Sequence, residues 1–162
     1  GIVGHAYRDG ECLDATNDDW YCYYLQGALD KDIIPKEMIE NCNVTKVTKT
    51  LAEATDDKKA VTTDVNVYTG KFDGDKPITR EEMAAIAVRC KNYKMRRLTD
   101  WDNERRYPIF SFKDSDEIDE KYISDVVEAY NLNYIDGMED GRFAPKENLT
   151  RAQAAVVMNN LK

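Results

Sequence analysis

A short pattern that occurs twice, 71 positions apart, constrains this chain more than any other feature. Its first copy is Gly70-Lys71-Phe72, followed after five residues by Ile78-Thr79-Arg80-Glu81-Glu82. Its second copy is Gly141-Arg142-Phe143, followed after the same gap by Leu149-Thr150-Arg151-Ala152-Gln153. An internal repeat predicts units that stack and share a core, so function is expected in surfaces between units.

The elements around the second copy follow a helix–loop–helix pattern. Apolar residues recur at helical spacing from Glu117 to about Asn131, which predicts one amphipathic helix. A glycine-punctuated loop follows, and a second helix is predicted from Thr150 to the end of the chain. In the first copy the matching first helix is expected at about 18–29, with Trp20 and its neighbouring tyrosines either in the core or available to stack on a sugar ring.

The first copy is longer because it contains about 30 extra residues, roughly 35–69. Within this insertion we expect a short helix at 36–40 and a helical stretch near 49–56. The alternating run at 61–68 predicts a weak strand. The sequence suggests no role for the insertion.

Each Thr-Arg step has a local explanation as a helix start. Thr79 with Glu82, and Thr150 with Gln153, have the spacing of capping boxes, in which side chains and backbone N–H groups bond reciprocally. The arginine then occupies the first helical position, where a cation opposes the helix dipole. We therefore expect each arginine to serve another purpose, either an internal carboxylate partner or an anionic ligand.

Charge excludes some functions. The net charge of −8 argues against general affinity for nucleic acid or anionic membranes, and no apolar run is long enough to span a membrane. The segment 89–106 departs from this balance, with seven basic against three acidic residues. It is read as a solvated face or linker, or as a local anion-contacting surface.

The combined motifs resemble those of the S-layer homology family. The second copy matches at Phe112-Lys113-Asp114, at the loop 137–145 and at 149–153. The first copy matches at Tyr7-Arg8-Asp9, at Trp20 and at its two motif segments. The resemblance divides the chain into repeat one at 1–93 with an insertion at about 35–69, a basic linker at 94–111, and repeat two at 112–162.

What the resemblance implies is a mainly α fold, in which helix–loop–helix repeats stack as a small helical bundle, with minor β structure in the insertion. It further implies binding of secondary cell wall polysaccharide in grooves between repeats, with arginine gripping a pyruvylated sugar. The residues that match this role are Arg80 and Arg151, accompanied by Trp20 and by Gly141 of the loop. Asp9 and Asp114 match an aspartate that ties the loop down.

The expected function is therefore a non-catalytic, extracellular module that anchors its parent protein to the wall or S-layer. The alternative is a degenerate scaffold for protein–protein contact or self-assembly, because only two repeats are legible and repeat two lacks the helix tryptophan. No catalytic residue, cofactor or metal is predicted. The segment from Asp136 to Glu147 imitates a calcium loop only loosely, since Met138 stands where an oxygen ligand is needed.

Four cysteines, at positions 12, 22, 42 and 90, allow three pairings. In an oxidising compartment, Cys12–Cys22 with Cys42–Cys90 is the simplest assignment. A buried free thiol at Cys90 is equally compatible with its helical spacing.

Overall fold

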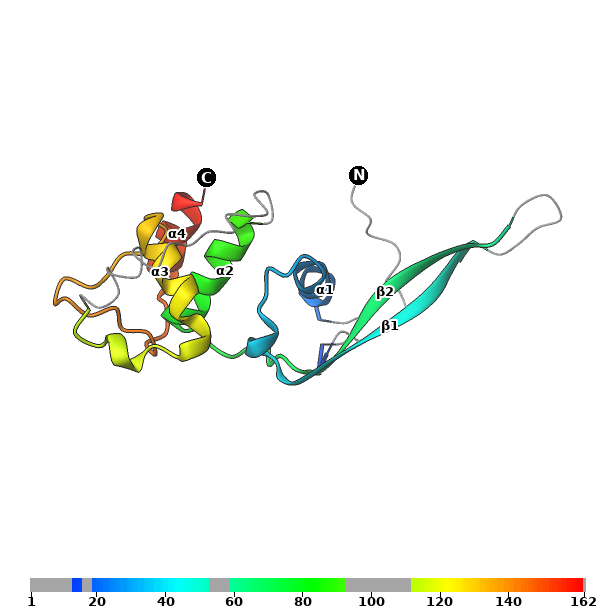
Figure 1. The fold of residues 1–162 in the computed structure, drawn as a ribbon, viewed down its shortest axis with the longest axis horizontal. Helices are drawn as coiled ribbons and strands as arrows, with labels where there is room; N and C mark the ends of the chain where they lie inside the picture. Colours follow the sequence, from blue (N-terminus) through cyan, green and yellow to red (C-terminus); the bar gives the residue numbers. More distant parts are fainter. Residues whose placement is uncertain (1–12, 16–18, 53–58, 93–111, 162) are drawn as a thin grey trace. The chain divides into compact units, whose positions relative to one another are not determined.

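The fold was analysed in a computed structural model, which describes residues 13–15, 19–52, 59–92 and 112–161. These residues form two compact units (Figure 1). Unit 1 comprises 1–30 and 36–74, and unit 2 comprises 31–35 and 75–162. The units do not coincide with the sequence repeats, because the second helix of repeat one belongs to unit 2.

Unit 1 is a two-stranded ribbon with one helix at its base (Figure 1). Strands β1 (Glu40–Ala52) and β2 (Val61–Lys71) pair antiparallel, with Val47 opposite Val65. Helix α1 (Cys22–Asp30) bonds to the ribbon through Gln26, whose amide donates to the carbonyl of Asn66 at 3.4 Å. A short 3₁₀ helix, η1 (Lys36–Met38), leads into β1.

The expectation of a mainly α fold is wrong, because the chain is mixed α and β. The insertion is the reason: β1 and β2, of 13 and 11 residues, run through most of it. The stretch 49–56, expected to be helical, instead begins within β1, and the predicted strand at 61–68 is present as part of β2. Closely spaced valines and threonines between Val44 and Thr50 favour the extended backbone, since β-branched side chains lose rotamer freedom in helices.

Of the two positions considered for Trp20 and its neighbouring tyrosines, the core is wrong for Trp20, Tyr23 and Tyr24. Helix α1 buries Cys22, Leu25, Gln26 and Leu29, whereas Trp20, Tyr23 and Tyr24 are exposed. The buried face of α1 therefore carries one cysteine, two leucines and one glutamine, whereas Trp20, Tyr23 and Tyr24 face solvent.

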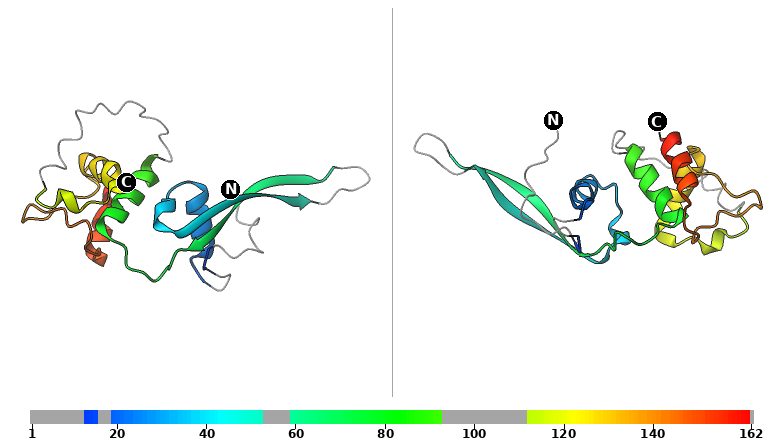
Figure 2. Two further views of the ribbon diagram at one scale, coloured as in Figure 1. Left: turned by 60° about the horizontal axis from the view of Figure 1, so that its bottom comes forward. Right: turned by 180° about the vertical axis from the view of Figure 1, so that it is seen from behind.

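Unit 2 gathers three helices into one group (Figures 1 and 2). Helix α2 (Arg80–Asn92) packs against α3 (Ile123–Asn131), and α4 (Arg151–Asn160) ends the described chain. Two 3₁₀ turns, η4 (Ser115–Glu117) and η5 (Glu120–Tyr122), precede α3. The helix predicted from 117 is therefore shorter than expected, although most of its apolar face is buried, including Ile118, Tyr122, Val126 and Val127.

The segments that lead into α2 and α4 pair with each other. The backbone N–H of Leu149 donates to the carbonyl of Ile78, and the N–H of Arg80 donates to the carbonyl of Glu147. The two helix starts of the repeats are thereby joined in an isolated antiparallel bridge between Thr79 and Asn148.

Candidate functional site

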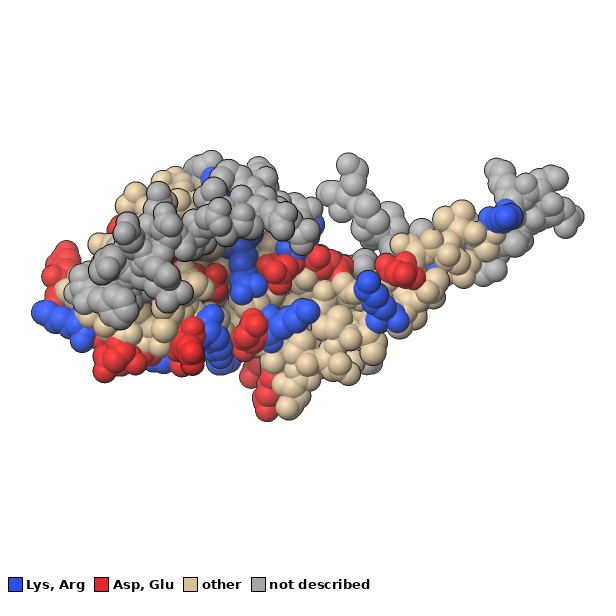
Figure 3. All heavy atoms as spheres, in the orientation of Figure 1, with Lys and Arg blue, Asp and Glu red and all other residues tan. Residues whose placement is uncertain are grey.

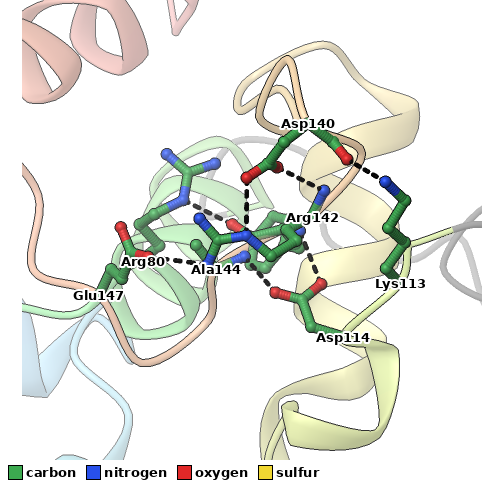
Figure 4. Close-up of polar contacts among 8 residues, drawn as sticks. Arg80, Lys113, Asp114, Asp140, Arg142, Ala144 and Glu147 are labelled. Carbon is green, nitrogen blue, oxygen red and sulfur yellow. Dashed lines mark hydrogen bonds and ion pairs between the residues drawn. The ribbon is translucent and has the colours of Figure 1, made fainter.

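The loop of repeat two is held by one buried aspartate (Figure 4). The two carboxylate oxygens of Asp114 accept hydrogen bonds from the backbone N–H groups of Phe143 and Ala144, both at 2.8 Å. Ala144 has φ 59°, in the left-handed region that non-glycine residues seldom adopt. The two hydrogen bonds donated to Asp114 offset the cost of that conformation, so the aspartate fixes the shape of the turn.

Arg142, which comes directly before the turn, pairs with one carboxylate that precedes the turn and one that follows it (Figure 4). Arg142 donates from Nε to Asp140 at 2.8 Å and from Nη1 to Glu147 at 2.9 Å. These two carboxylates raise the pKa of the Arg142 guanidinium. Lys113 Nζ donates to the carbonyl of Asp140 at 2.6 Å, and Gly141, at φ 85°, allows the chain to reverse there. Two carboxylates of the calcium-like segment, those of Asp140 and Glu147, are thus engaged by an arginine.

Arg80 fills the inner side of the same loop. Its Nε donates to the carbonyl of Phe143 at 2.7 Å, and its Nη2 donates to the carbonyl of Asp136 at 2.5 Å. The guanidinium lies 5.2 Å from the centroid of the Phe143 ring, and the residue is only 4% exposed. Burial lowers the pKa of Arg80, an effect that the charges of Glu147, Asp114 and Asp136 oppose. Arg80 therefore links the start of α2 to the turn and covers one side of the Phe143 ring.

Both predicted capping boxes are present. Thr79 Oγ1 accepts from the backbone N–H of Glu82 at 3.3 Å, while Glu82 accepts from the N–H of Thr79 at 2.9 Å. Thr150 and Gln153 make the same reciprocal pair at 3.2 Å and 2.9 Å. The Thr-Arg step thus positions the arginine at the start of each helix in the same way.

Next to Arg80, the buried Glu81 anchors a small ion cluster. Its carboxylate accepts from Lys146 Nζ at 2.6 Å and from the backbone N–H of Asp119 at 3.1 Å. Lys146 also pairs with the Asp119 carboxylate at 2.8 Å. The hydrogen bond from Lys146 lowers the pKa of Asp119. This cluster joins the start of α2 to the segment before α3.

Repeat one contains a turn with the same bracing, which the motif search missed. Asp14 accepts from the N–H groups of Phe72 and Asp73 at 2.7 Å and 2.9 Å, and Asp73 has φ 56°. Asp9, the residue matched to Asp114, lies outside the described residues. Spacing could have found Asp14, because it precedes Asp32 by 18 residues, as Asp114 precedes Asn133 by 19.

A second difference separates the two turns. Phe143 is fully buried, whereas Phe72 is half-buried and Asp14 is exposed. Burial raises the pKa of Asp14, but the backbone N–H groups of Phe72 and Asp73 outweigh it, and the net pKa lies below the ordinary value. The turn of repeat one is therefore braced in the same way but less deeply buried than the turn of repeat two.

Of the four residues predicted to contact a ligand, two lie on exposed surface. Arg151 is exposed at the start of α4, and Trp20 is 82% exposed, with its ring edge-on to Tyr21 at 5.9 Å. Arg80 and Gly141 instead belong to the repeat-two loop described above. The structure brings Arg80 and Gly141 to the two sides of one loop; Trp20 belongs to unit 1, and the other three residues belong to unit 2.

The cysteines are not paired in the described part of the chain. Cys22, Cys42 and Cys90 are free thiols, and Cys12 lies outside the described residues. Cys42 belongs to unit 1 and Cys90 to unit 2, so the Cys42–Cys90 pairing stays a prediction. Burial raises the pKa of the Cys90 thiol. Within the described residues, no group of three or more His, Cys, Asp or Glu side chains is placed to hold a metal ion, and no helix is long and apolar enough to cross a membrane.

Comparison with known proteins identifies the repeat-two segment. Residues 111–155 match the family model described as the S-layer homology domain. That range contains the Asp114-braced turn and the capped start of α4.

Three relatives share longer stretches. The chain is 37% identical to an endoglucanase of Bacillus sp. (strain KSM-635) over 60% of its length. It is 30% identical to an amylopullulanase of Thermoanaerobacterium thermosulfurigenes over 94% of its length, and 30% identical to exoglucanase XynX of Acetivibrio thermocellus over 99%. The chain spans 10%, 6% and 11% of these proteins, respectively. No solved structure matched the chain.

Proposed function

We propose that this chain, whose residues 111–155 form an S-layer homology domain, is a non-catalytic module that anchors a larger protein to an anionic wall polysaccharide. The domain associates the chain with the cell surface, and domains of this family bind cell wall polymers. The relatives carry enzyme names, but the chain corresponds to about a tenth or less of each. The family match is the observation that carries the proposal.

The exposed cation best suited to an acidic sugar is Arg151. A guanidinium can donate two parallel hydrogen bonds to one carboxylate, such as that of a ketal-linked pyruvate. Arg80 is less available, because its two carbonyl bonds and its burial would be lost on turning outward. We therefore assign the proposed carboxylate contact to Arg151 and a structural role to Arg80.

A second contact is proposed on unit 1, where Trp20, Tyr23 and Tyr24 are exposed together at the start of α1. Aromatic faces with exposed hydroxyls suit the mixed apolar and polar surface of a sugar ring. This surface carries no positive charge of its own, so it is expected to bind neutral and acidic sugars alike.

Co-sedimentation with purified walls, native and depyruvylated, tests these assignments. We expect binding to native walls and weaker binding to depyruvylated ones. Arg151→Ala should weaken binding to native walls by roughly tenfold and leave the residual binding to depyruvylated walls unchanged. Trp20→Ala should weaken both. Lys76→Ala, which removes one exposed positive charge elsewhere, and Leu132→Ala, which removes exposed apolar surface, are the matched controls.

Undetectable binding of the wild-type chain to both kinds of wall, with its circular dichroism intact, would overturn the wall-anchoring proposal. That result would favour the alternative of a scaffold for protein contacts. The engagement of Arg80 by backbone carbonyls is the observation that supports this alternative, because it withdraws one of the two repeat arginines from any ligand.

A further inference from the structure

Trp20 is exposed, but a neighbouring ring orients it. Its side chain is 82% exposed, and its ring lies edge-on to that of Tyr21, with centroids 5.9 Å apart and planes at 85°. Edge-to-face pairs of this kind are favourable beyond the area that they bury. Tyr21 itself is half-buried. The Tyr21 ring therefore favours one orientation of the Trp20 ring and leaves most of the indole open to solvent.

Tyr21 in turn packs on the bare backbone of Gly74. A Cβ atom at position 74 would overlap Cζ of Tyr21 and lie 2.6 Å from its hydroxyl oxygen. The tyrosine ring therefore occupies space that any other residue at this position would fill. The two residues before Gly74, Phe72 and Asp73, donate their backbone N–H groups to Asp14. The aspartate thus fixes the turn on which the tyrosine packs.

Repeat two carries a tyrosine at the matching place. Tyr21 stands directly before α1, and Tyr122 stands directly before α3. Trp20 precedes the first tyrosine, and the exposed Lys121 precedes the second, with its Nζ 4.9 Å from the centroid of the Tyr122 ring. In both repeats the tyrosine ring therefore supports the exposed side chain that comes before it.

We infer that Tyr21 is a positioning residue for the sugar contact proposed at Trp20, and that Gly74 leaves the space that its ring needs. The inference rests on the proposed function, because it concerns the same contact. A side chain that is already ordered loses less conformational freedom when a ligand binds to it. Tyr21 is assigned no sugar contact of its own, and it acts by holding the indole in the orientation that binds.

Co-sedimentation of Tyr21 and Gly74 variants with native and depyruvylated walls tests the inference. Gly74→Ala should displace the Tyr21 ring without straining the backbone, because Gly74 has no positive φ. Gly74→Ala and Tyr21→Ala should each weaken binding to both kinds of wall by roughly threefold to tenfold. Tyr21→Phe keeps the ring and should bind like the wild type. Gly27→Ala is the matched control, since a Cβ there meets nothing within 4 Å.

A double variant separates positioning of Trp20 from a general structural role. Tyr21→Ala should weaken binding in the wild-type background and have no further effect in a Trp20→Ala background, because the two residues act through one contact. Equal losses in both backgrounds would overturn the inference. So would wild-type affinity in Gly74→Ala and Tyr21→Ala when Trp20→Ala binds weakly.

Near-UV circular dichroism tests the orientation of Trp20 without any glycan. Subtracting the spectrum of Trp20→Phe from that of the parent chain isolates the Trp20 band, and a fixed ring gives a stronger band than a mobile one. We expect this band to shrink in Gly74→Ala with the far-UV spectrum unchanged. An unchanged band would overturn the inference whether or not the chain binds walls. A band that shrinks, in a chain whose wild type binds no wall, would instead overturn the proposed function alone.

Discussion

The turns of the two repeats share their backbone shape and their carboxylate brace, but differ in what covers them. In unit 2 the turn is sealed by Arg80, and Phe143 and Asp114 are buried. In unit 1 the equivalent Phe72 is half-buried and Asp14 is exposed. The comparison separates two tasks: the aspartate sets the turn, and an arginine from a capped helix start shelters it.

The charged residues of unit 2 also differ in role, because some form exposed ion pairs and Arg80 is buried. In Figure 3, acidic and basic side chains lie side by side on the face of unit 2 that is drawn. The pairs of Arg142 with Asp140 and Glu147 are of this exposed kind, and pairs of this kind contribute little to stability. Arg80 differs, because it is buried and its hydrogen-bond partners are backbone carbonyls instead of exposed carboxylates.

The largest effect is expected from removing the buried Arg80 side chain. Arg80→Ala should destabilise unit 2 by about 3 kcal/mol, because it leaves the carbonyls of Phe143 and Asp136 without their donor and opens a cavity beside the Phe143 ring. The matched change Arg151→Ala should alter the free energy of unfolding by no more than about 0.5 kcal/mol. Urea unfolding followed by far-UV circular dichroism measures the free energy of unfolding of both variants. Equal losses for Arg80→Ala and Arg151→Ala would contradict the different roles assigned to the two arginines.

A smaller effect is expected from weakening the two braces. Asp114→Asn should cost about 2 kcal/mol, because the amide offers one acceptor oxygen where the buried carboxylate offers two. Asp14→Asn should cost about 1 kcal/mol or less, since water can reach the exposed Asp14 turn and replace the lost bond. Thermal unfolding by calorimetry distinguishes the two, and a larger loss for Asp14→Asn would contradict the assigned difference in cover.

The smallest effect concerns pH. The hydrogen bond from Lys146 lowers the pKa of Asp119 in the folded chain, so this carboxylate favours folding above its unfolded pKa of about 4. That contribution should be lost as the pH falls below about 4, through the folded pKa. Asp119→Asn should therefore make stability less dependent on pH between about 5 and 3. An unchanged slope in a series of urea titrations would show that the Lys146 pair does not contribute.

Sequence patterns predicted what local chemistry determines. The starts of α2 and α4 follow from capping boxes, whose partners are three residues apart. Gly141 has a positive φ, a backbone conformation that glycine adopts without strain, so a glycine in this loop is a local signal of a turn. These features could be read from the repeat because each depends on residues close together in the chain.

Features that depend on distant contacts were not predictable in the same way. Arg80 donates to backbone carbonyls 56 and 63 residues away in the chain. Every residue has a backbone carbonyl, so the sequence does not indicate which ones accept these bonds. The ribbon was only partly foreseen, because the lysines of β1 are compatible with a helix, whereas its valines and threonines favour a strand. Asp14 was missed because the motif at 7–9 offered an aspartate in the expected aromatic context, although the spacing to Asp32 favours Asp14.

Amide hydrogen exchange of the two turns, measured on dilute chain, tests the comparison most directly. All four N–H groups, of Phe72, Asp73, Phe143 and Ala144, donate to an aspartate. We predict that those of Phe143 and Ala144 exchange far more slowly, because Arg80 covers their turn, and that Arg80→Ala removes the difference. Equal protection of both turns in the wild-type chain would contradict the claim that Arg80 shelters the turn of repeat two more than the turn of repeat one is sheltered.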